Sequence, residues 1–326
     1  MSVAVFGTLP DGRDVDVVTL RDGGMEARIL TFGATVQDLR VSGQQVCLGG
    51  DRLEDYLGSL RYAGAMVGRY ANRIGGARFT LDGVTYHTDP NFRDRHTLHG
   101  GAESAGGQLW ALGEVTDASV TLSLTMQDGH MGFPGVLTAE VTYRLDSGAL
   151  VVEAEAVADR ATPCCFAHHS YFVLDGSDDI TGHRLKVAAD RYLAVDADLI
   201  PEGPPAEVAG TAFDFRQMRE IGTSGYDHNF CLSDAPAPLR PVAWLDSPAS
   251  GLRLTVETTE PGLQVYDGAH LGGAAGYGGT TLHPKAGLAM EAQAWPDSPN
   301  RPDFPQAILR PGEVWRSETR YRFDPM

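Results

Sequence analysis

Alternating apolar and polar residues run through most of this chain and constrain its fold more than any other feature. The stretches at 120–126, 137–145, 150–158 and 252–260 alternate clearly, and 313–323 does so less regularly. Because the side chains of a β-strand point alternately to its two faces, a period of two is typical of strands with one buried face. Turn-forming residues separate the stretches, and "LDSGALVVEAEA" predicts a hairpin. We therefore expect an all-β, antiparallel protein.

Signals for helices and for domain boundaries are weak. Residues 51–58 and 215–222 have patterns that allow about two helical turns each, and no repeat or linker-like run divides the chain. The 326 residues include 39 glycines, which suits a fold with many tight turns. We expect residues 1–326 to form one large single-domain antiparallel β-sandwich.

Charge and cysteine content limit the partners and the compartment. The formal net charge of −17 repels nucleic acid and anionic lipid but hardly affects a neutral ligand such as a sugar. We expect no signal peptide and no transmembrane helix, because the first residues lack a basic region and no apolar run is long enough to cross a membrane. The spacing of Cys47, Cys164, Cys165 and Cys231 fits neither a disulfide framework nor a zinc motif. We expect reduced cysteines, a cytoplasmic location, and no nucleic-acid, membrane or obligate protein partner.

The histidines lack the spacing of a metal site. There is no His-x-His and no His-Glu-x-x-His, and His96 and His99 lie in a loop-like stretch before two glycines. Nucleophile-elbow and Walker-type signatures are also missing. The glycine-rich segment 268–279 is not followed by a helix signal and predicts a turn-rich loop rather than a nucleotide site. We expect neither a metal nor a cofactor.

Two adjacent histidines interrupt an apolar segment, "CCFAHHSYFVL" at 164–174. In a strand, His168 would share one face with Phe166 and Phe172, and His169 would share the other with Tyr171. At most one of the two imidazoles can then face a given pocket.

Polar residues inside other apolar stretches are candidates for a binding face. Alternation over "AMEAQAW" places Glu291, Gln293 and Trp295 on one side of a strand. An acceptor, an amide and a stacking indole would suit a sugar, although an outward-facing polar side is an equally good interpretation of this stretch. Gln264 and Tyr266 share a face in the same way.

Loop-like segments hold further candidates whose ordinary interpretation is structural. Asp227 and His228 follow a Ser-Gly turn, where an aspartate commonly bonds its own backbone. Asn72 and Arg73 are adjacent among glycines, so only a bulge or loop would aim both at one ligand. His99 either forms a structural hydrogen bond or faces a ligand.

Taken together, these segments resemble the galactose mutarotase (aldose 1-epimerase) family. The matching stretches follow the family order over nearly the whole chain: "FGATVQDLRV", "VGRYANRI", "TLHGG", "HHSYFVL", "GYDHNF", "PGLQVYDG" and "AMEAQAWPDSPNRPDFP" with "LRPGE". The resemblance implies a single-domain antiparallel β-sandwich, the galactose mutarotase-like supersandwich, in agreement with the strand pattern.

The resemblance also implies roles for individual residues. The catalytic histidine of the family corresponds to His169, and the catalytic glutamate to Glu291 in "MEAQ". His99 is expected to assist at the ring oxygen. The positions expected to bind the sugar are Asn72, Arg73, Asp227 and Gln264. The chain departs from the family pattern at His168, where asparagine is usual, and at Val173, Asp267 and Ala269, which border the site.

The implied activity is interconversion of the α and β anomers of a free, neutral monosaccharide, with Glu291 as base and His169 as acid. A sugar-phosphate 1-epimerase would need a cluster of arginines at the pocket rim, and none is evident. A non-catalytic carbohydrate-binding protein would not need an acid and base together. A glycosidase would need two carboxylates facing one bond, and with Asp227 as the second carboxylate the sequence leaves this alternative open.

Overall fold

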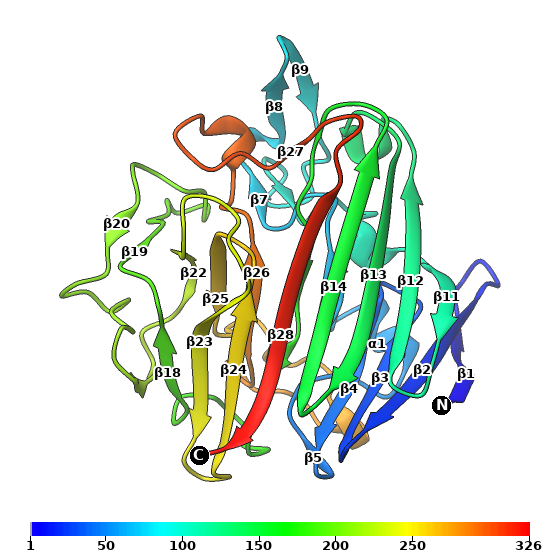
Figure 1. Ribbon diagram of the computed structural model, residues 1–326, viewed down its shortest axis with the longest axis vertical. Helices are drawn as coiled ribbons and strands as arrows, with labels where there is room; N and C mark the ends of the chain where they lie inside the picture. Colours follow the sequence, from blue (N-terminus) through cyan, green and yellow to red (C-terminus); the bar gives the residue numbers. More distant parts are fainter. Residues whose placement is uncertain (1) are drawn as a thin grey trace.

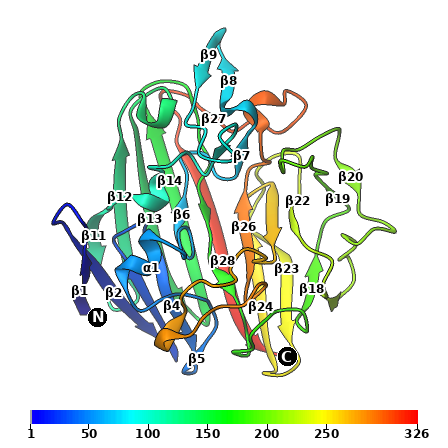
Figure 2. The ribbon, with the colours of Figure 1, turned by 180° about the vertical axis from the view of Figure 1, so that it is seen from behind.

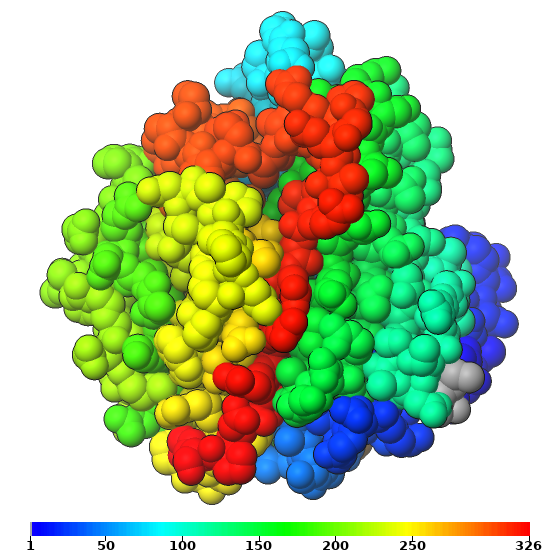
Figure 3. Space-filling model, in the orientation of Figure 1, coloured from blue at the N-terminus to red at the C-terminus, as the bar shows by residue number. Residues whose placement is uncertain are grey.

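A large nine-stranded sheet forms one layer of the molecule. The computed structural model describes residues 2–326. In this sheet the C-terminal strand β28 lies between β14 and β24 and so joins an early and a late part of the chain (Figures 1 and 3). The order of strands is β11 (Ala111–Val115), β12 (Ser119–Met126), β13 (Leu137–Asp146), β14 (Ala149–Ala158), β28 (Trp315–Pro325), β24 (Leu252–Thr258), β23 (Arg240–Ser247), β18 (Arg184–Val187) and β21 (Arg219–Glu220).

Two smaller sheets lie side by side behind the large one (Figure 2). A bridge between Cys47 and Phe172 connects them. The five-stranded sheet has the order β1 (Ser2–Thr8), β2 (Asp14–Asp22), β3 (Met25–Leu30), β4 (Thr35–Val41) and β5 (Gln44–Gln45). The six-stranded sheet has the order β17 (Tyr171–Phe172), β26 (Leu288–Gln293), β25 (Gly262–Tyr266), β22 (Asp227–Cys231), β19 (Arg191–Tyr192) and β20 (Ala206–Glu207).

Short paired strands and single helical turns complete the chain. The four two-stranded pairs are β6 (Met66–Val67) with β16 (Ala167–His168), β7 (Arg73–Ile74) with β10 (Thr97–Leu98), β8 (Arg78–Leu81) with β9 (Val84–His87), and β15 (Thr162–Pro163) with β27 (Ile308–Leu309). The helical elements are α1 (Leu53–Leu57) and short 3₁₀ turns at Gly75–Ala77, Ala105–Gly107, His130–Gly132, Tyr277–Gly279 and Ser298–Asn300. Within residues 2–326, no helix has the length and apolar character needed to cross a membrane.

The strands predicted from alternation are confirmed. All five stretches coincide with β12, β13, β14, β24 and β28, and every strand pair within the three large sheets is antiparallel. In β13, buried and more exposed residues alternate along the whole strand, as expected for one face on the core. The hairpin between β13 and β14 turns at Ser147 and Gly148, which have φ values of 52° and 84°. Two consecutive residues with positive φ are what a tight hairpin requires.

The helix prediction is half correct. Residues 51–58 contain the single helix α1, whereas 215–222 form no helix and contribute strand β21. The reason is a set of tertiary contacts: the Phe215 ring is buried and the Arg219 guanidinium lies 3.7 Å from its centroid. The Arg219 side chain also donates to the carbonyls of Ala212 and Asp214. These contacts hold the segment extended against its weak helical pattern.

The core between the layers positions the six-stranded sheet. Phe230, Leu263, Val265 and Met290 of that sheet are at most 1% exposed and belong to the same apolar cluster as residues of the large sheet. Phe172 packs against Tyr321 of β28, with ring centroids 5.0 Å apart. One face of the six-stranded sheet is therefore fixed on the core, and its other face is left for polar side chains.

Candidate functional site

The outward face of the six-stranded sheet carries a row of polar side chains. Asn229 of β22 pairs directly with Gln264 of β25, which in turn pairs with Glu291 of β26. Residues that are directly opposite in an antiparallel pair point to the same face. Two residues along the same strands, and so on the same face, Asp227 is opposite Tyr266. The strand register thus gathers two carboxylates and two amides on one surface.

Asn72 and His99 reach this surface from the neighbouring β7–β10 pair through unusual backbone conformations. Both have positive φ, 63° for Asn72 and 53° for His99. The His99 N–H donates to the Asn72 carbonyl at 2.8 Å, and the Asn72 N–H donates to His99 Nδ1 at 3.2 Å. This reciprocal pair fixes both side chains. The positive φ of Asn72 gives the irregular backbone that was predicted to be necessary if the adjacent Asn72 and Arg73 are to face one ligand.

His169 enters the site where the chain passes from β16 to β17. Its N–H donates to the Ala65 carbonyl, and its ring lies 5.3 Å from that of His99. His169 Nε2 is 3.5 Å from Glu291 Oε1. His168 points the other way and packs its ring edge-on against Tyr143 and Tyr321 of the large sheet. The prediction that the two histidines face opposite sides is confirmed.

Burial sets the protonation of the central pair. Glu291 and His169 are 2% and 4% exposed. Desolvation raises the pKa of Glu291 well above its usual value, with the nearby Asp227 charge acting in the same direction. Desolvation lowers the pKa of His169 to about 4. Over a wide pH range the pair therefore holds a single proton, which burial favours on the carboxyl group.

The same cluster has the residue types of a metal site, but its hydrogen bonding suits proton transfer better. One ligand atom each of His99, His169 and Glu291 lies within 4.8 Å of the others. Because His99 Nδ1 accepts a hydrogen bond from the Asn72 N–H, the proton of a neutral His99 is on Nε2. A protonated Nε2 has no lone pair for a cation, and it can donate to an oxygen in the site.

Arg73 and Asp227 form the charged part of the surface. Arg73 Nη2 lies 3.0 Å from Asp227 Oδ2, and Gln264 Nε2 donates to Asp227 Oδ1 at 2.6 Å. The Arg73 guanidinium also lies 4.8 Å from the centre of the Phe92 ring. The positive charge is thus balanced within the protein. The interpretation of Asp227 as a residue that bonds only its own backbone is wrong.

Several buried polar atoms of this surface have no hydrogen-bond partner within the described chain. An unpaired buried polar atom costs roughly 1–3 kcal/mol, so such a group of atoms suits a ligand rich in hydrogen-bonding groups. These atoms are Arg73 Nε, His169 Nδ1, Gln264 Oε1, Glu291 Oε2, Asn229 Oδ1 and both side-chain polar atoms of Gln293.

The structure brings together the seven residues to which the sequence analysis assigned a catalytic or sugar-binding role. It does not place Trp295 with them. Asn72, Arg73, His99, His169, Asp227, Gln264 and Glu291 all lie in this cluster through the contacts above. Trp295, considered as a stacking surface, is instead 2% exposed and packs against Phe304, with its indole N–H donating to the Pro261 carbonyl. The reason is that β26 ends at Gln293, so the alternation does not extend to Trp295.

Sequence reasoning did not select the aromatic residues around the cluster or Asn229. The Tyr62 and His99 rings are 4.9 Å apart, and the Tyr171 and His169 rings 5.1 Å apart. Asn229 was detectable, because it lies two positions after Asp227 in the same strand and so shares its face. Tyr62 comes from a separate segment and carries no local pattern, whereas Tyr171 lies two positions after His169 and was expected to share its face.

The departures from the family pattern lie beside the cluster. Asp267 pairs with Lys285 at 2.9 Å and accepts a hydrogen bond from the Tyr226 N–H. Val173 is 5% exposed in the apolar core, and Ala269 is exposed. Neither ring nitrogen of His168 has a partner among residues 2–326.

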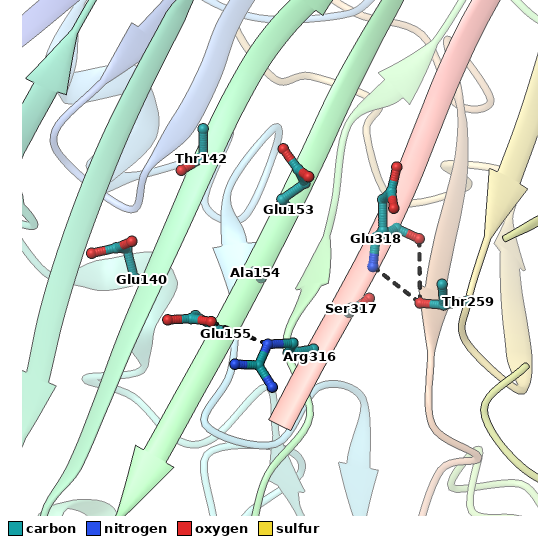
Figure 4. A pocket seen from close by; sticks show the side chains of 9 residues that line it. All are labelled: Glu140, Thr142, Glu153, Ala154, Glu155, Thr259, Arg316, Ser317 and Glu318. Atoms are coloured by element: carbon teal, nitrogen blue, oxygen red, sulfur yellow. Dashed lines mark hydrogen bonds and ion pairs between the residues drawn. The ribbon is translucent and has the colours of Figure 1, made fainter. Parts of the chain in front are cut away.

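A broad depression on the opposite side of the molecule contains none of the site residues. It encloses about 470 Å³ on the outer face of the large sheet (Figure 4). Glu140 is opposite Glu155, and Glu153 is opposite Glu318. Arg316 pairs with Glu155 at 3.3 Å. This surface is acidic, open and largely ion-paired, unlike the enclosed cluster above.

Comparison with known proteins finds similarity over nearly the whole chain. The sequence profile of a family described as aldose 1-epimerase matches residues 16–322. Galactose mutarotase of Rattus norvegicus is 42% identical over 98% of this chain and 97% of its own length. Aldose 1-epimerase of Escherichia coli (strain K12) is 38% identical over 96% of each chain. The crystal structure of an aldose epimerase homologue from C. elegans matches with a TM-score of 0.90 at 29% identity, covering 95% of this chain and 99% of that one.

Proposed function

The chain belongs to the aldose 1-epimerase family, whose reaction interconverts the α and β anomers of a free sugar, and we propose that Glu291 and His169 perform the two proton transfers of this reaction. The 3.5 Å approach of His169 Nε2 to Glu291 Oε1 in a buried site is the observation that carries this assignment.

Mutarotation requires one group that removes a proton and one that supplies it. The C1 hydroxyl loses a proton as the bond between C1 and the ring oxygen breaks, and the ring oxygen gains one. After rotation about the C1–C2 bond, the ring closes on the other face of the carbonyl and both transfers run in reverse. The number of protons held by the protein is the same before and after, which suits a pair that holds one proton.

Glu291 is the base in this scheme and His169 the acid. Burial favours the single proton on Glu291 in the free site, so productive binding has to be accompanied by its transfer to His169. Glu291 is then a carboxylate beside the C1 hydroxyl, and His169 an imidazolium beside the ring oxygen. The polar groups of a bound sugar favour this charged arrangement over the neutral one that burial alone selects.

The remaining polar residues position the ring. His99 Nε2–H is oriented as a donor, because Nδ1 is occupied by the Asn72 N–H, and we assign it to the ring-oxygen side. Arg73, Asp227 and Gln264 form a connected network whose unused hydrogen-bonding capacity fits sugar hydroxyls. These contacts hold the sugar ring in place while C1 rotates, so the reacting atoms stay oriented toward the acid and the base, which lowers the entropic part of the barrier.

The charge balance supports a neutral monosaccharide as the substrate. The Arg73 guanidinium is paired with Asp227, so it is not free to bind a phosphate group. The net charge of −17 likewise supports a neutral small molecule over nucleic acid or anionic lipid. We further propose a single domain over 1–326, since the site draws residues from both early and late parts of the chain, and a cytoplasmic location, which four free buried cysteines support.

Polarimetry on freshly dissolved α-D-glucose and α-D-galactose tests the assignment. Wild type should speed the approach to anomeric equilibrium, and Glu291→Gln and His169→Ala should each lower kcat by about 10²–10⁴. Glu313→Gln and His87→Ala, at exposed positions, are the matched controls and should keep wild-type rates. Retention of wild-type kcat in Glu291→Gln would show that another group is the base. Circular dichroism checks that each variant is folded.

A further inference from the structure

A second pocket lies between the end of β26 and the start of β28 and contains no residue of the catalytic cluster. It encloses about 340 Å³. Ala294, Pro261, Ile308, Leu309 and Trp315 supply much of its mainly apolar wall. Figure 3 shows a hollow where the yellow, orange and red segments meet at this end of the sheet. The volume fits a small organic molecule with an apolar body.

A buried carboxyl group lines this mainly apolar pocket. Glu260 is 2% exposed, and its environment raises its pKa to about 7, chiefly through desolvation, with hydrogen bonding by Ser317 acting in the opposite direction. Arg240 uses Nη2 to donate to the Glu260 backbone carbonyl at 3.0 Å. No ion pair involves the Glu260 carboxylate among residues 2–326. The Arg240 charge lowers the pKa of Glu260, but desolvation outweighs it, so the ionised carboxylate remains costly and a cationic ligand beside it would reduce that cost.

The rest of the pocket also favours a cation with an apolar body. Its lining includes a second acidic residue, Glu313, and no lysine or arginine. The Trp315 indole, held against Phe166 with ring centroids 5.6 Å apart, offers an aromatic face for a cation or an apolar ring. We propose that this pocket binds a small primary amine with an apolar group, its ammonium paired with Glu260 and its body against Trp315.

Two residues that line the pocket are close in sequence to the two proposed catalytic residues, Glu291 and His169. Ala294 directly follows Gln293 at the end of β26, the strand that carries Glu291, and its N–H donates to Cys165 Sγ at 3.1 Å. Cys164, in the segment that leads to His169, lines the pocket as well. None of the residues proposed to contact the sugar lines this pocket, so we expect a ligand here to leave the sugar contacts free.

Calorimetric titration with 2-phenylethylamine at pH 8 tests the proposal, with 2-phenylethanol as its uncharged counterpart. We expect saturable binding of the amine at one site and at least about tenfold weaker binding of the alcohol. Glu260→Gln should weaken amine binding by at least about tenfold, and Glu313→Gln, at the exposed rim, by less than about threefold. Excess D-galactose should leave amine binding unchanged.

The pH dependence gives a second measurement that needs no variant. Binding requires the Glu260 carboxylate, so affinity should rise about tenfold between pH 6 and pH 8 as Glu260 ionises around its pKa of about 7. The groups that face Glu260 from the surrounding elements are Arg240, Cys164, Cys165, Glu313 and Ser317. Of these, the arginine stays charged and burial raises the pKa of both thiols above this range.

Three results would overturn the proposal. They are the absence of saturable amine binding at millimolar concentration, equal affinity for amine and alcohol in the wild type, and displacement of the amine by galactose. The last would place the amine in the sugar site. The comparison of amine and alcohol keeps the test valid if Glu260→Gln does not fold.

Discussion

Replacing Glu260 with glutamine should stabilise the protein at pH 8 and have much less effect at pH 5. The folded-state pKa of about 7 lies above the ordinary value of 4.5, so the unfolded chain loses this proton first as the pH rises. The contribution of Glu260 to the stability of the wild type therefore falls from about pH 4.5 until its carboxyl group has also ionised in the folded state, near pH 7. Glutamine has a similar shape and does not titrate, so it removes this loss.

The magnitude follows from the size of the shift. A difference of about 2.5 pKa units, from 4.5 to about 7, corresponds to about 3 kcal/mol of destabilisation once both states are ionised, at 1.36 kcal/mol per unit. At pH 5 the same linkage gives about 1 kcal/mol. The advantage of Glu260→Gln over wild type should therefore grow by about 2 kcal/mol between pH 5 and pH 8.

Urea unfolding of both proteins at pH 5, 6, 7 and 8 measures this difference. Any effect of the substitution on the contact with Ser317 is the same at every pH and cancels when the pH values are compared. Glu313→Gln, exposed at the rim of the same pocket, is the control for removing an acidic side chain there. A Glu260→Gln difference that is flat with pH would refute the reasoning, since it would mean that the Glu260 carboxyl group ionises alike in both states.

Three further predictions concern the catalytic cluster. The enzymatic rate, corrected for the buffer-catalysed rate, should be level at mid pH. It should fall as the pH drops through about 4, where protonation of His169 gives the Glu291–His169 pair its second proton, and fall again above the raised pKa of Glu291. Polarimetry from pH 4 to 10 checks this, and a titration of the rate near pH 6.5 would contradict it. Asp227→Asn, which leaves the buried Arg73 without its partner, should raise KM by roughly tenfold or more with a smaller change in kcat, read from initial rates. Asn72 has a φ of 63°, which glycine adopts without strain and alanine does not. Asn72→Gly should therefore be more stable than Asn72→Ala by about 1 kcal/mol and unfold at a higher temperature. Equal melting temperatures would refute the strain argument.

The sheet layers and the faces of single strands were predictable from the sequence because alternation is a local property. Glu291 and Gln293 share a face, and so do Gln264 and Tyr266, as the pattern indicated. Periodicity could not predict which strands lie next to one another or in which register they pair. That Gln264 lies between Asn229 and Glu291 depends on a register between segments far apart in the chain.

The irregular parts of the site carried the weakest local signals. Asn72 and His99 adopt positive φ although neither is glycine, and their reciprocal hydrogen bonds form only when the β7–β10 pair is assembled. The catalytic roles were suggested by resemblance to a family rather than by spacing. Trp295 and the segment 215–222 were interpreted incorrectly for a common reason, since tertiary packing around Phe304 and Phe215 overrode a short local pattern.

The position of β28 has a consequence for how the chain is made. This strand comes after all the other described strands in the sequence, yet it lies in the middle of the nine-stranded sheet, between β14 and β24. While the ribosome is still synthesising residues 315–325, the two halves of that sheet each present an unpaired edge, and exposed edges invite association with other chains. Closure of the large sheet is therefore a late event in the life of each nascent chain, and a stalled or truncated product that lacks β28 should be prone to aggregation.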